Sequence, residues 1–224
     1  MRAHWFGICD YDQALGQQEL LATQLRQTAS AGFIMGLEHA SVITLGKRGN
    51  SAIDVGEDCP IPVVETDRGG QATLHSEGQL VVYPIVSLRD LGINVREYVA
   101  GLESITVKTL GHFGISAFAG ACPGIFTTKG KIGFIGVRVD RGITRHGLSL
   151  NVSNDLGEFQ WIRSCGVSAA SVDRVCDTDP TLSTQQIFGR WAHEFGLHFA
   201  RNIEWGLTSD ANLVNSPAPN EARS

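Results

Sequence analysis

Cys165 is the residue of this chain whose chemistry stands out first. It is followed by Gly166 at the end of a short run that changes from apolar to polar. A cysteine thiolate is a nucleophile, and a neighbouring glycine amide could hold the oxyanion that forms when the sulfur attacks an acyl group. A buried structural thiol is the alternative, and for a single Cys-Gly pair the residues alone favour it.

A second stretch, residues 68–75, combines a flexible backbone with polar side chains and reads Arg-Gly-Gly-Gln-Ala-Thr-Leu-His. Gly69 and Gly70 would let the backbone approach a ligand and present amides to it, while Thr73 adds a hydroxyl and His75 an imidazole. The stretch matches neither the phosphate-binding loop nor the dinucleotide fingerprint. A tight turn between two strands is an equally good interpretation.

Lys131 stands at the head of a predicted strand, where a solvated edge lysine is the simple interpretation. It lies in a locally basic stretch, residues 126–150. The charged residues there are Lys129, Lys131, Arg138, Arg141 and Arg145 against Asp140. The stretch is either a solvated hairpin or a basic rim that attracts an acidic partner.

The histidine and cysteine spacings argue against a metal site. His193 and His198 are five residues apart, whereas the helical zinc motif needs histidines four apart on one face. The five cysteines are Cys9, Cys59, Cys122, Cys165 and Cys176, without any C-x-x-C pair. We therefore expect reduced thiols in a cytoplasmic protein, and neither a metal nor a cofactor.

Composition excludes several other classes of protein. The chain has 224 residues, a formal net charge of −5, 42% hydrophobic residues and 18% charged residues. No apolar run approaches the roughly 18 residues that a membrane helix needs, and the N-terminus does not resemble a signal peptide. An acidic chain is also a poor candidate for binding nucleic acid.

Hydrophobic periodicity predicts three helices, at about 12–28, from 95 to about 111, and from 184 to 196. Capping-box patterns mark two of the starts, Asn94 with Glu97 and Ser183 with Gln186. The predicted strands cover 33–37, 41–45, 61–65, 80–88, 131–139 and 146–152, the last two joined by a turn at 140–142. Residues 47–60 read as a surface loop. We expect one α+β domain over residues 1–207, a mixed sheet flanked by helices, and a flexible tail at 208–224.

Taken together, the motifs resemble those of the lipoyl(octanoyl) transferase family. The similarity is collinear over most of the chain. The matching segments are Leu37-Glu38-His39, Thr44-Leu45-Gly46, residues 68–75, Gly78-Gln79-Leu80-Val81, Pro123-Gly124-Ile125-Phe126, residues 131–138, residues 142–152 and Cys165-Gly166. Each segment is weak evidence by itself, but the ordered set is specific.

The resemblance implies the catalytic fold shared with biotin and lipoate protein ligases. It also implies that Cys165 is the nucleophile and that Lys131 lowers its pKa. The acyl-substrate site would be lined by Arg68, Gly69, Gly70, Gln71, Ala72, Thr73, Leu74, His75, Phe134, Ile135, Gly136, Gly147, Leu148 and Ser149. Among these, Leu74, Phe134, Ile135 and Leu148 suit an aliphatic chain.

The implied reaction moves an octanoyl group from acyl carrier protein to a lysine through a cysteine thioester, without ATP. The acceptors would be the lipoyl domains of 2-oxoacid dehydrogenase complexes and the glycine cleavage H protein. Two alternatives stay open: an ATP-dependent lipoate or biotin ligase, and a non-catalytic protein that binds lipoyl domains or carrier protein.

The chain departs from the family pattern at a few positions. Leu74, Ser76 and Glu77 differ from the usual Tyr-His-Gly-Pro-Gly-Gln motif, Ser164 stands for a proline, Phe126 for a tryptophan, and Ser149 for an alanine. Cys165, Lys131 and His75 are retained, so we expect activity. Chain-length preference and the shape of the acyl site are the properties that these departures would change.

Overall fold

Two β-sheets form the framework of the protein, for which a computed structural model describes residues 1–28, 32–163 and 172–206. The strands of the large sheet are β1 (Arg2–Ile8), β2 (Phe33–Glu38), β6 (Gln79–Ile85), β7 (Phe118–Ala119), β8 (Ile125–Phe126), β9 (Lys131–Asp140), β10 (Ile143–Asn151) and β11 (Glu204–Trp205). The small sheet holds β3 (Val42–Leu45), β4 (Val63–Glu65) and β5 (Ala72–His75).

The strand order is β11-β1-β2-β6-β10-β9-β8-β7 in the large sheet and β4-β3-β5 in the small one. β1 runs parallel to β2 and β11, whereas β2, β6, β10, β9, β8 and β7 pair antiparallel in turn. The small sheet is also mixed, since β3 is parallel to β4 and antiparallel to β5. The expected mixed α+β architecture is confirmed.

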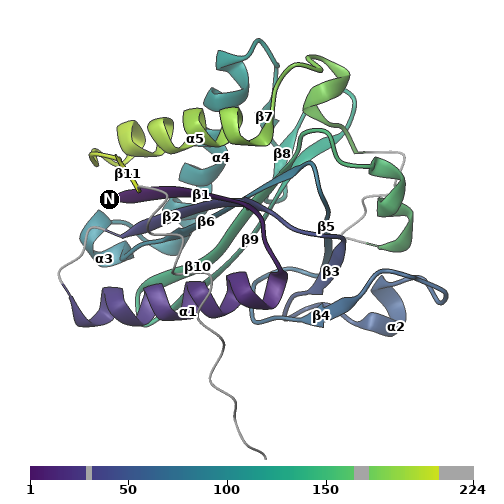
Figure 1. Cartoon of the computed structure of the whole chain (residues 1–224), viewed down its shortest axis with the longest axis horizontal. Helices are drawn as coiled ribbons and strands as arrows, with labels where there is room; N and C mark the ends of the chain where they lie inside the picture. Colours follow the sequence, from purple (N-terminus) through teal and green to yellow (C-terminus); the bar gives the residue numbers. More distant parts are fainter. Residues whose placement is uncertain (29–31, 164–171, 207–224) are drawn as a thin grey trace, which may run out of the picture.

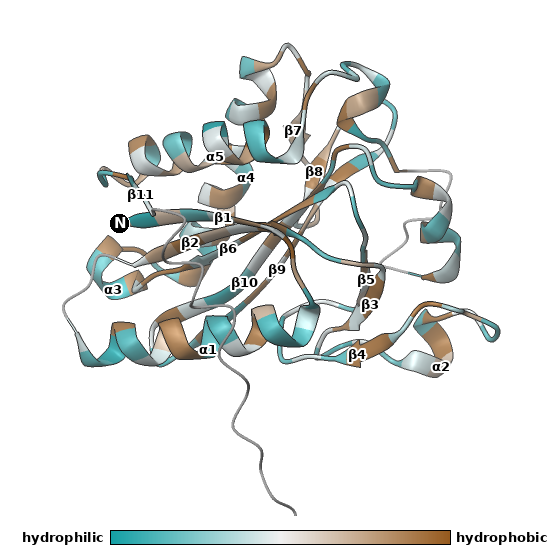
Figure 2. Cartoon of the chain, viewed as in Figure 1, coloured by the Kyte–Doolittle hydropathy of each residue, from teal (hydrophilic) through white to brown (hydrophobic). Residues whose placement is uncertain are grey.

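Helices cover the large sheet on both faces (Figure 1). The helices are α1 (Tyr11–Gln27), α2 (Ser51–Asp54), α3 (Leu88–Leu91), α4 (Val95–His112) and α5 (Thr184–His198). α4 and α5 pack on one face, through a core that includes Trp191 and Phe195. α1 and the small sheet share the other face. Each long helix has both hydrophobic and hydrophilic residues along its length (Figure 2), as expected for helices with one buried side.

Strand alternation assigns neighbouring residues of β9 and β10 to opposite faces. Leu148 pairs with Val82, whose side chain joins the core beneath α4 and α5. Ser149 pairs with Val81, which packs toward α1. Because Ser149 also pairs with Phe134, and Leu148 with Ile135, the two pairs lie on opposite faces of the strands.

The helix starts are where the sequence predicts them. Asn94 and Glu97 form a complete capping box at α4, and Ser183 and Gln186 form another at α5. The turn between β9 and β10 is the expected hairpin, with Arg141 at φ 48° and Gly142 at φ 82°. These positive angles are typical of the two-residue hairpin turns that match strand twist.

Several predicted boundaries are wrong. α5 does not end at Gly196 but continues to His198; Gly196 is needed because a Cβ there would lie 2.7 Å from the Arg201 carbonyl oxygen. The predicted loop 47–60 contains α2, and the predicted strand 80–88 ends at Ile85. Val95, the first residue of α4, is 45% exposed although it is apolar.

The strands that were not predicted are β1, β5, β7, β8 and β11. The predicted tail, residues 208–224, lies outside the described residues. Within the part of the chain that the structure describes, no helix is long and apolar enough to cross a membrane.

Candidate active site

A cavity of about 300 Å³ lies where the small sheet meets β9 and β10. Its volume is at the lower end of the range of about 300–1,000 Å³ that ligand pockets span. The predicted substrate-site residues that line it are Arg68, Gly69, Gly70, Gln71, Ala72, Thr73, His75, Phe134, Ile135, Gly136, Gly147, Leu148 and Ser149. Three segments that are far apart in sequence therefore meet around one space.

Lys131 also lines this cavity and is almost fully buried. Its ammonium group donates a hydrogen bond to the Pro123 carbonyl at 3.3 Å. The same Nζ atom lies 4.9 Å from the ring centroid of Phe134 and 5.4 Å from that of Phe126. The simple interpretation of a solvated edge lysine is wrong, because carbonyl oxygen and aromatic faces surround the charge.

Cys165, the predicted nucleophile, lies outside the described residues. The described chain leads up to it at Arg163, whose amide donates to the Asp54 carbonyl at 2.8 Å. The chain is described again from Val172, which pairs with Lys131 in a parallel bridge, and the Asp173 amide donates to the Lys131 carbonyl at 3.0 Å. Val172 and Asp173 therefore lie beside the backbone of Lys131.

Residues 68–71, which we call the glycine-rich wall, form the side of the cavity that belongs to the small sheet. The Arg68 guanidinium donates to the Thr44 carbonyl at 2.5 Å and to the Gly69 carbonyl at 2.9 Å. The Gly69 amide donates to the Val137 carbonyl at 2.9 Å. Gly136 permits this approach, because a Cβ there would lie 3.1 Å from the Gly69 carbonyl oxygen.

Asp67 anchors the wall to the large sheet. Its carboxylate lies 2.5 Å from an Arg145 guanidinium nitrogen and 3.5 Å from Nε of Arg138. His146 Nε2–H donates to the same carboxylate at 2.9 Å. Burial raises the pKa of Asp67, but the His146 hydrogen bond and the Arg145 charge outweigh it, so the pKa is below its ordinary value.

His146 was not assigned a role from the sequence, although it lines the cavity. Its φ of 55° is unusual for a residue inside a strand. The strained backbone is held by the Gln18 side-chain oxygen of α1, which accepts from the His146 amide at 2.7 Å. Strain of this kind costs about 1–3 kcal/mol and persists where several contacts enforce it.

Two further histidines are buried here: His75 lines the cavity, and His39 lies next to it. His39 Nδ1–H donates to the Cys9 carbonyl at 2.7 Å, and the Tyr83 hydroxyl donates to His39 Nε2 at 2.9 Å. Burial lowers the pKa of His39 to about 4, although the hydrogen bond to Cys9 opposes the shift. The His39 and His75 rings are 5.6 Å apart.

The hydrogen-bond network assigns the tautomer of His75. The Gln79 amide nitrogen donates to the Leu74 carbonyl and to Asn151 Oδ1, so the Gln79 oxygen is the acceptor for His75 Nδ1–H at 2.8 Å. Nε2 of His75 therefore carries a lone pair. Burial and the neighbouring His39 lower the pKa of His75 to about 3, so the ring is neutral at neutral pH.

Two hydroxyl groups that line the cavity have no hydrogen-bond partner among the described residues: Oγ1 of Thr73 and Oγ of Ser149. Their side chains belong to residues that are 8% and 2% exposed. Leaving a buried polar group unsatisfied costs about 1–3 kcal/mol, so these atoms indicate that the cavity receives a polar ligand atom or water.

Leu74 is the one predicted substrate-site residue that does not line the cavity. It is fully buried and packs with Ile43, Leu45 and Phe159 on the other side of β5. The alternation along the strand explains the difference, since Thr73 and His75 face the cavity. The missed lining residues include Tyr11, Arg48, Tyr83, Val99, Cys122, Pro123 and Val137.

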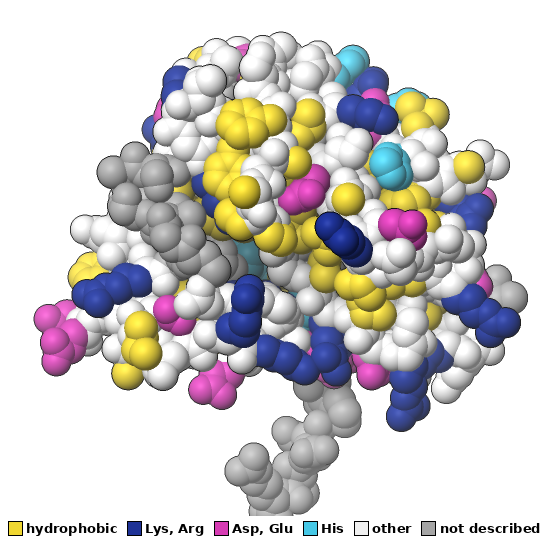
Figure 3. Space-filling model, turned by 180° about the vertical axis from the view of Figure 1, so that it is seen from behind, with side chains coloured by type: hydrophobic (Ala, Val, Ile, Leu, Met, Phe, Trp, Pro, Cys, Tyr) yellow, Lys and Arg dark blue, Asp and Glu magenta, His cyan; other side chains and the backbone are white. Residues whose placement is uncertain are grey.

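The predicted basic rim is only partly present. Arg138 and Arg145 pair with Asp67, and Lys131 is buried in the cavity. Lys129 and Arg141 remain exposed. On the face seen in Figure 3, Lys and Arg side chains gather below a recess in which a histidine is visible, and hydrophobic side chains gather above it.

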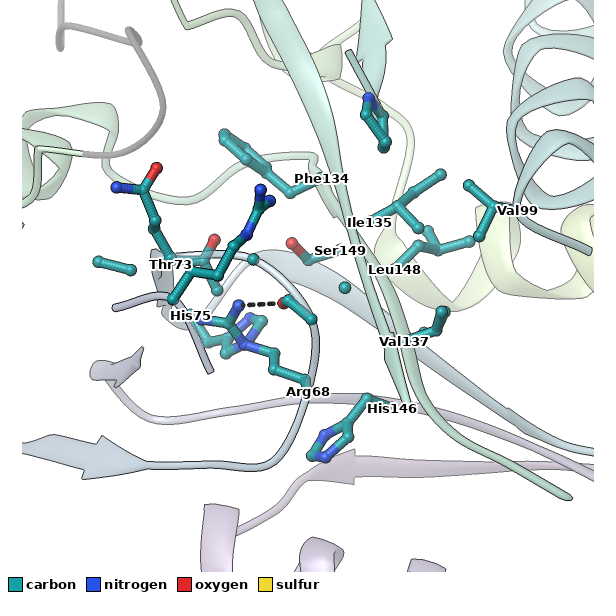
Figure 4. Close-up of a pocket in the computed structure, with 18 of the residues that line it drawn as sticks. Arg68, Thr73, His75, Val99, Phe134, Ile135, Val137, His146, Leu148 and Ser149 are labelled. Carbon is teal, nitrogen blue, oxygen red and sulfur yellow. Dashed lines mark hydrogen bonds between the residues drawn. The ribbon is translucent and has the colours of Figure 1, made fainter. Parts of the chain in front are cut away.

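Among the residues that the structure describes, no group of three His, Cys, Asp or Glu side chains could hold a metal ion. Histidine rings, hydroxyl groups and apolar side chains line the cavity (Figure 4), and Lys131 lines it as well.

Comparison with known proteins places the chain in a family. The model of the lipoyl protein ligase A/B catalytic domain matches residues 10–196. An octanoyltransferase of Solibacter usitatus is 38% identical over 216 residues, covering 93% of this chain and 95% of the relative. An octanoyltransferase of Xanthomonas axonopodis pv. citri is 44% identical over 182 residues, covering 78% and 77% of the two chains.

Solved structures confirm the expected fold. A lipoate-protein ligase A bound with ATP superimposes with a TM-score of 0.77 at 15% identity, covering 96% of this chain and 93% of the other. The biotin protein ligase of Aquifex aeolicus in complex with biotin and ATP has a TM-score of 0.57 at 10% identity, covering 89% and 70%. The chain belongs to the lipoyl protein ligase A/B catalytic domain family, and its curated relatives there are octanoyltransferases.

Proposed function

We propose that the protein transfers an octanoyl group from octanoyl-acyl carrier protein to a lysine of lipoyl domains. The observation that carries this proposal is the cavity, in which Lys131 and three separate substrate-site segments meet. The octanoyltransferase names of relatives at 38% and 44% identity support the same reaction. The acceptors would be lipoyl domains of 2-oxoacid dehydrogenase complexes and the glycine cleavage H protein.

The reaction proceeds in two acyl transfers. The Cys165 thiolate attacks the carbonyl carbon of the octanoyl thioester, a new carbon–sulfur bond forms, and the carrier leaves as its thiolate. The lysine amine of the acceptor then attacks the octanoyl-Cys165 thioester. An amide forms, the Cys165 thiolate leaves, and the amine loses one proton. Exchange between thioesters needs little driving force and the amide is more stable, so the reaction uses no ATP.

Lys131 supplies the charge that this chemistry needs. An ordinary cysteine has a pKa of about 8.5, so only a small fraction is thiolate at neutral pH. An ammonium group next to the sulfur favours the anion and lowers the pKa of Cys165. The Phe126 and Phe134 rings and the Pro123 carbonyl hold Nζ of Lys131 in place.

Apolar side chains along the cavity suit the hydrocarbon part of the substrate. Phe134 lies on one face of the β9–β10 pair, while Ile135 and Leu148 lie on the other, where Val99 of α4 also lines the cavity. Burying an aliphatic chain contributes about 0.8 kcal/mol for each methylene group.

A reducing compartment such as the cytoplasm suits this mechanism, since the nucleophile must stay a thiol. The cysteines among the described residues, Cys9, Cys59, Cys122 and Cys176, are free. We also propose that residues 1–207 form the catalytic domain and that residues 208–224 form a tail.

The intact mass of the protein after mixing with octanoyl-acyl carrier protein tests the covalent step. We expect one octanoyl adduct that hydroxylamine removes, and that is absent in Cys165→Ala. Cys122→Ala is the matched control, because Cys122 is an exposed thiol on the cavity rim and should keep the adduct. Transfer that continues in Cys165→Ala would reject the thioester mechanism.

Replacing Lys131 with methionine tests its assigned role. Lys131→Met keeps an unbranched side chain between the two aromatic rings but removes the charge. The apparent pKa for alkylation of Cys165 by iodoacetamide should rise toward about 8.5 or above. An unchanged profile would remove Lys131 from this role.

The two alternatives predict different results in the same assay. An ATP-dependent ligase would incorporate free octanoate or lipoate when ATP is added, and would do so in Cys165→Ala. A non-catalytic binding protein would bind carrier or lipoyl domains without acylation of Cys165 and without turnover.

A further inference from the structure

The cavity contains two buried hydroxyl groups that make no hydrogen bond to the described residues. Oγ1 of Thr73 and Oγ of Ser149 lack partners there, although the two residues are only 8% and 2% exposed. Thr73 is on β5 and Ser149 on β10, so each sheet contributes one hydroxyl group. Figure 4 shows both hydroxyl groups turned toward the space between the two sheets. Both are therefore placed to bind a polar atom inside the cavity.

The hydroxyl groups border the part of the cavity that holds the Lys131 charge. Ser149 pairs with Phe134 across β9 and β10, and residues directly opposite each other in an antiparallel pair have Cβ atoms about 4.5–5.5 Å apart. Nζ of Lys131 lies 4.9 Å from the centroid of the Phe134 ring. Phe134 thus links Ser149 to Lys131, and the hydroxyl groups belong to the reacting centre of the proposed function.

The substrate offers these hydroxyl groups a single partner. An octanoyl thioester group has one oxygen atom, which is the carbonyl oxygen, and its hydrocarbon chain neither donates nor accepts a hydrogen bond. Each serine or threonine hydroxyl can donate one hydrogen bond. The carbonyl oxygen, with two lone pairs, is therefore the substrate atom that matches two uncommitted donors.

His75 lines the same cavity but does not add a third donor. Its Nδ1–H donates to the Gln79 side-chain oxygen, so Nε2 presents a lone pair. Burial lowers the pKa of His75 to about 3, which keeps the ring neutral. A lone pair would repel a negative oxygen, so the donors from this part of the cavity are the two hydroxyl groups.

We propose that the hydroxyl groups of Thr73 and Ser149 donate hydrogen bonds to the carbonyl oxygen of the acyl group and stabilise the oxyanion that forms there. This inference rests on the proposed acyl transfer and assigns two further catalytic residues to it.

Both acyl transfers pass through such an oxyanion. When the Cys165 thiolate attacks, a sulfur electron pair forms the new carbon–sulfur bond and the carbonyl π pair moves onto the oxygen. That pair returns to carbon as the carrier leaves as its thiolate. The lysine amine then repeats this sequence at the octanoyl-Cys165 thioester, with Cys165 as the leaving group. The hydroxyl groups keep their protons, and their hydrogen bonds become stronger as the oxygen becomes negative.

The two donors should differ in importance. Thr73 belongs to a segment that matches the family pattern, whereas Ser149 stands where the family usually has alanine. A protein with alanine at that position lacks the second donor. Ser149 is therefore an additional donor in this chain, and we expect its loss to cost less than the loss of the Thr73 hydroxyl.

A comparison of acylation with alkylation of Cys165 tests the inference. Single-turnover rates are measured with octanoyl-acyl carrier protein and with iodoacetamide at the same pH. Acylation passes through an oxyanion, whereas alkylation displaces iodide in one step and forms none. The isosteric Thr73→Val should lower the acylation rate by about tenfold or more, and Ser149→Ala by about threefold to tenfold. Neither variant should change the alkylation rate, whereas Lys131→Met should lower both rates.

Two substitutions on α4 serve as matched controls. The Thr109 hydroxyl is also buried but donates to the Ile105 carbonyl at 2.8 Å. Neither Thr109 nor Ser104 lines the cavity. Thr109→Val and Ser104→Ala should therefore leave the acylation and alkylation rates unchanged. Far-ultraviolet circular dichroism checks that each variant is folded.

The outcomes separate this inference from the proposed function. If Thr73→Val and Ser149→Ala leave the acylation rate unchanged, or lower acylation and alkylation equally, the oxyanion assignment is overturned while acyl transfer stands. If the unsubstituted protein forms no octanoyl adduct on Cys165, the proposed function itself is overturned.

Discussion

At the scale of single residues, the protein keeps two buried histidines neutral. The pKa of His39 is lowered to about 4 and that of His75 to about 3, in both cases chiefly because burial disfavours the charged ring. Their hydrogen bonds to the Cys9 carbonyl and the Gln79 amide fix which nitrogen carries the proton. The unfolded chain would bind protons at an ordinary pKa near 6.5.

Stability should therefore fall as the pH is lowered below about 6.5. The contribution of the neutral rings is complete above that pH. It is lost progressively toward about 4 for His39 and about 3 for His75, because the unfolded state binds more protons over this window. At pH 5 each histidine would cost up to about 2 kcal/mol of unfolding free energy. Urea unfolding at pH 7 and pH 5 measures the difference.

The matched comparison is between His39→Gln and His193→Gln. His193 is exposed on α5, so its replacement should leave the pH dependence almost unchanged. His39→Gln should remove about half of the loss between pH 7 and pH 5, whatever its effect at pH 7. Equal pH dependence in the two variants would contradict the burial argument.

At the scale of elements, the approach of α5 to β2 depends on Gly36. A Cβ at that position would lie 2.4 Å from the Phe188 ring, which is fully buried. The ring has no space to move away, because it also packs against Trp5 and Trp205. A glycine inside a strand is usually unfavourable, and here close packing explains it.

Gly36→Ala should destabilise the protein by about 1–3 kcal/mol, the usual cost of overpacking a core. Gly16→Ala is the control, because a Cβ at Gly16 of α1 meets no atom within 4 Å. Alanine there should stabilise the helix by about 0.5–1 kcal/mol. Thermal unfolding of the two variants should give shifts of opposite sign, and shifts of the same sign would refute this reading of Gly36.

Elements that are defined by local signals could be predicted from the sequence. The capping boxes at Asn94 and Ser183 and the turn at Gly142 depend on residues close in sequence, and all three are present. β5 could not be predicted, since its four residues are buried on both sides and show no alternation. The end of α5 could not be predicted either. Gly196 is required by its close packing against Arg201 and does not mark the end of the helix.

At the scale of the whole molecule, Asp67 joins the glycine-rich wall to the large sheet. Its carboxylate contacts Arg138 of β9 and both Arg145 and His146 of β10. Asp67→Asn should weaken the ion pairs and cost about 1 kcal/mol of stability, since the carboxylate is partly exposed. It should raise KM for the acyl donor more than it lowers kcat, because the wall shapes the binding space.

Asp140→Asn is the matched control for that prediction. Asp140 also forms an ion pair, with Arg26 at 3.2 Å, but it lies at the hairpin turn and does not line the cavity. Its replacement should leave KM unchanged. Equal effects of the two substitutions on KM would show that Asp67 has no special role at the cavity.

The candidate site could be predicted only in part. The chemistry of Arg68, Thr73 and His75 could be predicted from their residue types. That they share one site with Lys131 could be predicted only from the family resemblance. The role of His146 depends on Asp67, which is 79 residues away in sequence, and on Gln18 of α1. Such long-range pairings leave no local signal. Leu74 was misplaced because the burial of β5 on both sides could not be read from its neighbours.

The small sheet is connected to the rest of the protein in a way that affects how the two sheets are held together. Residues 42–75 form one continuous segment between two strands of the large sheet, β2 and β6. The chain leaves the large sheet at residues 39–41 and returns to it at residues 76–78. Glu38 sits at this crossing, where its carboxylate accepts from the Gly78 amide at 2.6 Å and from the Thr184 hydroxyl of α5 at 2.5 Å.

Glu38 thus joins the two ends of this segment, and Asp67 joins the segment to the large sheet. The contacts of Glu38 and Asp67 join this segment to the rest of the protein, and neither is a hydrogen bond between paired strands. We therefore expect the spacing of the two sheets, and with it the width of the cavity, to depend on the contacts of Glu38 and Asp67. Glu38→Gln should weaken the contacts with Gly78 and Thr184. Amide hydrogen exchange should then become faster across residues 42–75 and stay unchanged in α4.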